Sequence, residues 1–119
     1  LAACWFEADL SAKFRRALPL TGLVQISDYV AGDRMTPNRA VPGDGMMPNE
    51  WLLRELLDAG YEGVFDLELV GPRIEAEGGF AATRRGARTG ARSRRVAANR
   101  TARYAPVPPT NTPPKKNSS

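Results

Sequence analysis

Histidine is absent from the sequence, and cysteine occurs only once, at Cys4. Without histidine the chain has neither the commonest zinc ligand nor the base of a Ser-His or Cys-His catalytic pair. A single cysteine cannot form a disulfide within the chain. These chemistries are therefore excluded for this chain on its own.

Long apolar runs are absent as well. No stretch approaches the roughly 18 to 20 apolar residues that a membrane-spanning helix requires, and the first residues lack the basic start of a secretory signal. We therefore expect a cytoplasmic protein without a membrane partner. The chain begins with Leu1 and not with methionine, which favours a fragment or a processed product.

Acidic residues are missing from the C-terminal part of the chain. Residues 1–83 hold all 13 acidic residues and seven basic ones, for a net charge of −6, whereas residues 84–119 hold ten basic residues and no acid. A length of 119 residues suffices for one small domain at most. The charge division predicts a folded part over 1–83 and a separate basic part over 84–119.

The basic part is rich in arginine, alanine, glycine and proline, and its few large apolar residues are Val96, Tyr104 and Val107. Such a segment cannot bury enough apolar surface to offset its ordering entropy, so we predict a disordered tail over 84–119. A basic arm can bind nucleic acid through its arginines. A solvated tail without a binding role is favoured, because the lone Tyr104 offers little for base stacking. Translation of a shifted reading frame is a third explanation.

Residues 1–83 contain the pattern of a strand, a helix and a second strand. Pro19 ends a first apolar stripe at helical spacing, Trp51 belongs to a second stripe that we expect in the core, and Gly60 is placed as a left-handed helix stop. The predicted elements are a helix over 5–18, a strand over 23–29, a long loop over 30–48, a helix over 49–59 and a strand over 64–69.

Two strands joined by one helix form a βαβ unit with parallel strands, which predicts an α/β fold. In such folds ligands bind at the carboxyl ends of the strands. Gln25 and Glu68 stand at those ends, together with the long loop that leaves the first strand. Asp28 and Asp66 are expected to be structural.

Three motifs within residues 3–78 carry a family resemblance. They are Leu23-Val24-Gln25-Ile26-Ser27-Asp28-Tyr29, Asn38-Arg39-Ala40-Val41-Pro42-Gly43-Asp44-Gly45 and Gly60-Tyr61-Glu62-Gly63-Val64-Phe65-Asp66-Leu67-Glu68. In this order they resemble the end of a sugar phosphate isomerase/epimerase with the xylose isomerase-like TIM barrel, of the hydroxypyruvate isomerase or ketose 3-epimerase kind. The resemblance implies that the two strands are the seventh and eighth of a (β/α)8 barrel.

The resemblance also implies a divalent metal (Mn²⁺, Mg²⁺ or Co²⁺) and a sugar or sugar-phosphate substrate. It places Gln25 and Glu68 among the metal ligands, Glu68 also as a proton-transferring carboxylate, and Arg39 at the substrate. Enolisation beside a carbonyl needs such a carboxylate and a cation that stabilises the enediolate. The other two expected ligands, a glutamate and an aspartate, precede Leu1 in the family.

The resemblance thus implies an isomerase or epimerase present as a C-terminal fragment, which we expect to be inactive alone because half of its metal site is missing. Two alternatives remain open from the residues themselves. One is a small non-enzymatic α/β protein with a nucleic-acid-binding arm, and the other is a non-functional remnant. The oligomeric state cannot be predicted.

Overall fold

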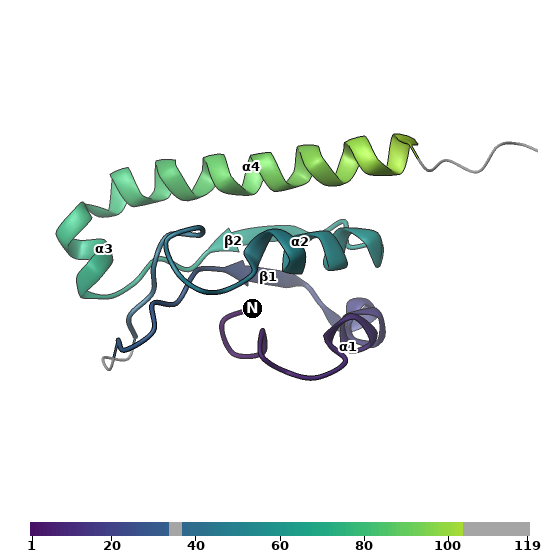
Figure 1. Cartoon of the computed structure of the whole chain (residues 1–119), viewed down its shortest axis with the longest axis horizontal. Coiled ribbons are helices and arrows are strands. Elements are labelled where there is room, and N and C mark those ends of the chain that lie inside the picture. Colours follow the sequence, from purple (N-terminus) through teal and green to yellow (C-terminus); the bar gives the residue numbers. More distant parts are fainter. Residues whose placement is uncertain (34–36, 104–119) are drawn as a thin grey trace, which may run out of the picture.

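The computed structural model describes residues 1–33 and 37–103, and these form a small mixed α/β domain with two parallel strands. Figure 1 shows the arrangement of the elements. In chain order they are α1 (Leu10–Ala17), the 3-10 turn η1 (Leu18–Leu20), β1 (Leu23–Ile26), α2 (Asn49–Asp58), β2 (Val64–Leu67), α3 (Pro72–Glu77) and α4 (Gly79–Arg103). The predicted α/β class and the parallel βαβ unit are confirmed.

The two faces of the sheet differ in exposure. In the register Leu23 pairs with Val64 and Gln25 with Asp66, and all four residues are exposed. The alternate residues point to the other face, where Val24 and Ile26 of β1 are buried and Phe65 and Leu67 of β2 are partly buried. The sheet therefore has one face covered by helices and one open face.

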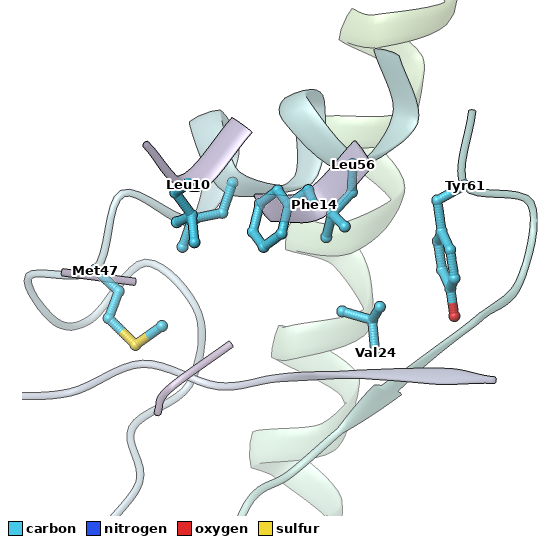
Figure 2. Packing of buried hydrophobic residues seen from close by; sticks show 7 residues of the cluster. Leu10, Phe14, Val24, Met47, Leu56 and Tyr61 are labelled. Atoms are coloured by element: carbon cyan, nitrogen blue, oxygen red, sulfur yellow. The ribbon is translucent and has the colours of Figure 1, made fainter. Parts of the chain in front are cut away.

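The covered face packs against α1 and α2. Figure 2 shows Leu10 and Phe14 of α1 beside Leu56 of α2, with Val24 of β1 and Tyr61 close by. A second cluster joins Val41, Ile74 and Ala82, and Leu69, which follows β2, packs against it. Residues at positions 52, 53 and 56 of α2 are all buried, as the apolar stripe predicts, and Gly60 has the expected positive φ of 96°.

The first helix is shorter than the predicted 5–18. Backbone N–H groups of Cys4 and Trp5 both donate to the carbonyl of Leu1, which closes a tight turn, and Asp9 adopts a left-handed conformation with φ of 55°. A left-handed residue cannot continue a right-handed helix, so α1 begins only at Leu10.

Residues 84–103 also require a correction, because they continue helix α4 and are not a disordered tail. Ala82 and Gly86 are buried on this helix. Gly86 lies close to β2, since a Cβ atom added to Gly86 would be 3.2 Å from the Cδ1 atom of Leu67. Small residues four positions apart let the helix backbone approach the sheet. The predicted disorder of residues 104–119 falls outside the described residues.

One arginine fastens the start of α4 to the rest of the domain. Arg85 donates to the carboxylate of Asp44 in the long loop (2.7 Å) and to that of Glu77 at the end of α3 (2.6 Å). These contacts lower the pKa of both carboxyl groups, mainly through the hydrogen bond from Arg85. Arg85 of the basic part is thus paired with acidic residues of the part before residue 84, and residue 83 lies within α4.

Across the described residues, no helix combines the length and the apolar character needed to cross a membrane.

Candidate functional site

The open face carries its polar residues toward the carboxyl ends of the strands. Gln25 faces Asp66 across the strand pair, and its Nε2 atom donates to Asp66 Oδ2 at 3.3 Å. The N–H of Glu68 donates to the carbonyl of Ile26 at 2.9 Å, so the pairing extends past the end of β2. Since side chains alternate along a strand, Glu68 lies on the same face as Asp66.

Glu68 forms an ion pair with Arg39. The Nε atom of Arg39 lies 3.2 Å from Glu68 Oε2, and the two side chains keep 25% and 27% of their surface exposed. A pair with this exposure is reachable by a small molecule from solvent. The structure thus brings together two of the three residues that the sequence predicts at the site, while Gln25 pairs with Asp66 and not with Glu68.

The long loop delivers Arg39 to this position. Asp28 and Ala40 form an isolated antiparallel bridge, with N–H to carbonyl distances of 2.8 and 2.9 Å, and the N–H of Arg39 donates to the carbonyl of Val70 at 2.9 Å. Arg39 is therefore held at the carboxyl ends of both strands at once.

The amino group of Leu1 completes the surroundings of the open face. It donates to the backbone carbonyl of Gln25 at 2.8 Å. Burial lowers the pKa of this amino group, and the nearby Cys4 and Glu68 act in the opposite direction. The first residue of the chain therefore lies beside the edge of β1, within electrostatic reach of Glu68.

The residues of this chain do not by themselves fit the divalent metal that the resemblance implies. Among the described residues, no group of three or more His, Cys, Asp and Glu side chains is arranged to hold a metal ion. The amide nitrogen of Gln25 is directed at Asp66, and Glu68 is engaged by a cation, Arg39. A site built from Gln25 and Glu68 alone is too sparse in oxygen donors for such an ion.

Asp28 has a structural role, as expected from the sequence. Its carboxylate is fully buried and accepts three backbone N–H groups, from Tyr29 (2.8 Å), Gly43 (2.8 Å) and Met47 (2.9 Å). Gly45 lies against the same carboxylate, where an added Cβ would be 2.4 Å from Asp28 Oδ1. This carboxylate organises the loop that carries Arg39.

A second candidate surface was not predicted from the sequence. A groove lies between the long loop, the first half of α2 and α4, and its lining includes Trp51, Arg54 and Arg92. Trp51 is 40% exposed, so its predicted place in the core is wrong. Its position at the edge of a stripe defined by Leu52, Leu53 and Leu56 is the signal that locates it at a boundary of the buried face.

Comparisons with protein-family models, with curated proteins and with solved structures found no match for this chain. The geometry of the two surfaces is therefore the basis for the functional proposals that follow.

Proposed function

We propose that the open face of β1 and β2 is one wall of the substrate site of a sugar or sugar-phosphate isomerase/epimerase, and that the two strands correspond to the seventh and eighth of a TIM barrel. The single observation that carries the proposal is the Arg39–Glu68 pair at 3.2 Å, held at the carboxyl ends of two parallel strands on an uncovered face. Parallel α/β folds place their ligands at this end of the sheet.

Each residue of the pair has a defined role in this proposal. A carboxylate such as that of Glu68 can accept the proton from a carbon next to a carbonyl group. The guanidinium of Arg39 contacts Glu68 through Nε, and its fork of N–H donors suits a hydroxyl, carboxylate or phosphate oxygen of the substrate. Holding the substrate oxygen beside the carboxylate would align the C–H bond for proton transfer.

The proposal requires further residues for a complete reaction. A divalent metal, when bound in such an enzyme, stabilises the negative charge of the enediolate. Gln25 and Glu68, the two ligands that the resemblance assigns to this chain, are engaged by Asp66 and Arg39 here, so further donors would have to come from outside this chain. We therefore expect the chain alone to bind Mn²⁺ weakly and to leave ketoses unconverted.

Sugar binding by the isolated chain tests the proposal without requiring turnover. In an NMR titration with ketoses and ketose phosphates, we expect millimolar binding that shifts the backbone amides of Gln25, Arg39 and Glu68. Arg39→Ala should weaken this binding about tenfold, as expected for the loss of one charge-assisted hydrogen bond. Arg73→Ala is the matched control, because Arg73 lies on α3 and pairs with Asp33.

Equal effects of the Arg39→Ala and Arg73→Ala substitutions would contradict the proposed substrate site. Turnover of a ketose by the chain alone that is lost in Glu68→Gln would contradict the expected inactivity but support the role of Glu68. A titration in which sugars shift only amides on the helical side of the sheet would also overturn the proposal.

A further inference from the structure

The groove between α2 and α4 has the size of a ligand site. Its volume is about 860 Å³, within the range of about 300 to 1,000 Å³ that is usual for small-molecule sites. The groove lies on a different part of the domain from the Arg39–Glu68 pair, since none of its lining residues belongs to the open face of the sheet. Its lining includes Gly45, Pro48, Trp51, Arg54, Thr89 and Arg92.

Trp51 supplies a flat aromatic surface in this groove. Its side chain is 40% exposed, whereas Leu52 and Leu53, the next residues of α2, are 0% and 3% exposed. An exposed indole offers a face on which a planar ring can stack, and stacking on aromatic side chains is a main source of affinity for unpaired bases. Helix α2 therefore provides the aromatic group that lines this groove.

The adjoining surface of α4 is strongly basic. Arg84, Arg88 and Arg92 follow one another at intervals of four residues, so they form one exposed stripe along the helix. Among the described side chains, none of these three arginines has an acidic partner in an ion pair. The positive charge of the stripe is not neutralised by Asp44 and Glu77, because these two acidic residues pair with Arg85.

Arg54 adds a further guanidinium on the opposite wall. It donates to Glu50, one turn earlier in α2, at 2.9 Å. An exposed pair of this kind contributes little and is readily exchanged for a stronger anion. Arg92 and Arg54 therefore line the same groove as Trp51, and their guanidinium groups can bind phosphate.

We propose that this groove binds a single-stranded nucleic acid, with a base stacked on Trp51 and backbone phosphates on Arg92, Arg54 and the arginine stripe of α4. A single strand is favoured over a duplex, because in a duplex the base faces are covered by stacking on their neighbours. An anionic membrane is disfavoured, because Phe80, which is 79% exposed and lies 5.9 Å from the Arg84 guanidinium, is the one large apolar residue in the stretch 79–92 of α4. A single apolar side chain is less than the apolar face by which an amphipathic helix enters a membrane.

Fluorescence tests this proposal in the full chain. The sequence has two tryptophans, so Trp5→Phe leaves Trp51 as the only reporter. We expect short oligothymidine or oligouridine to quench this reporter and to bind with an affinity that falls as salt rises. Comparison of the DNA and RNA oligomers establishes whether deoxyribose or ribose strands are preferred, and either preference supports single-strand binding in the groove.

Variants separate the groove from charge attraction by the other arginines. Trp51→Ala should weaken oligonucleotide binding about 5- to 100-fold, and Trp51→Phe should restore part of the loss. Arg92→Ala should reduce the slope of log affinity against log salt by about 0.7, the value for one single-strand phosphate contact. Arg16→Ala is the matched control, because Arg16 is an exposed arginine on α1, on the other side of α2 from α4.

Three results would overturn the proposal. The first is binding that is unchanged in Trp51→Ala while circular dichroism shows the variant to be folded. The second is an equal loss of salt dependence in Arg92→Ala and Arg16→Ala. The third is tighter binding to vesicles of phosphatidylserine than to either oligonucleotide. None of these readouts depends on sugar binding at Arg39, so this proposal and the proposed function can fail separately.

Discussion

Replacement of Asp28 by asparagine should strongly destabilise the domain. The carboxylate is fully buried, and Oδ1 accepts from Tyr29 and Met47 while Oδ2 accepts from Gly43. An asparagine can keep two of these bonds in weaker, neutral form, but its NH2 group must then face the third N–H donor. The part-buried N–H of Gly43 then loses its acceptor at a cost of about 1 to 3 kcal/mol, and the loss of charge weakens each remaining bond by about 1 kcal/mol.

The expected loss in the free energy of unfolding is therefore about 3 to 5 kcal/mol, a large share of the roughly 5 to 15 kcal/mol typical of a domain. Urea denaturation followed by circular dichroism measures it. Asp58→Asn, which makes the same chemical change at an exposed residue of α2, should alter the stability by less than about 0.5 kcal/mol. A loss below about 1 kcal/mol in Asp28→Asn would refute the role of the buried carboxylate.

Two further predictions concern the attachment of α4. The pKa values of Asp44 and Glu77 are lowered by Arg85, so the stability from these contacts is present above the ordinary carboxyl pKa of about 4 and is lost as the pH falls through the lowered values. The stability difference between wild type and Arg85→Ala should therefore shrink in acid, and a difference that stays constant between neutral and strongly acidic pH would contradict this linkage. Gly86→Val should lower the stability by about 1 to 3 kcal/mol, because its side chain would enter the space of Leu67. Gly90→Ala, where an added Cβ meets no atom within 4 Å, should raise the stability by about 0.5 to 1 kcal/mol, and calorimetric melting that ranks the two variants in the reverse order would contradict the packing described here.

The central βαβ unit could be predicted from local patterns. The apolar stripe of α2 and the alternation in the strands are set by periodicity, and Gly60 marks the helix end through its positive φ. The helical conformation of residues 84–103 was missed for a physical reason. Glycine, alanine and arginine carry little apolar surface to signal burial, yet Gly86 packs because it is small and Arg85 is fixed by acids that are 41 and eight residues away in the sequence.

The candidate site could be predicted only in part. Position at the carboxyl end of a strand pointed to Glu68, and the family resemblance pointed to Arg39. The structure places the two side chains in an ion pair. The partner of Gln25 could not be foreseen, because it depends on the register that sets Gln25 opposite Asp66. The edge position of Trp51 in the apolar stripe of α2 was a local signal for its exposure, whereas the groove beside it depends on how α4 packs against α2.

The open face of the sheet changes character along its length. At the start of the strands Leu23 and Val64 lie opposite each other and remain 50% and 63% exposed, whereas the far end carries Gln25, Asp66 and Glu68. A layer laid over this face must therefore be amphipathic along the strand direction, with aliphatic atoms at one end and hydrogen-bonding groups at the other. A uniformly apolar or uniformly charged partner surface would complement only one end of the open face. The change from apolar to polar residues therefore determines both the orientation and the composition of any segment that packs on this face.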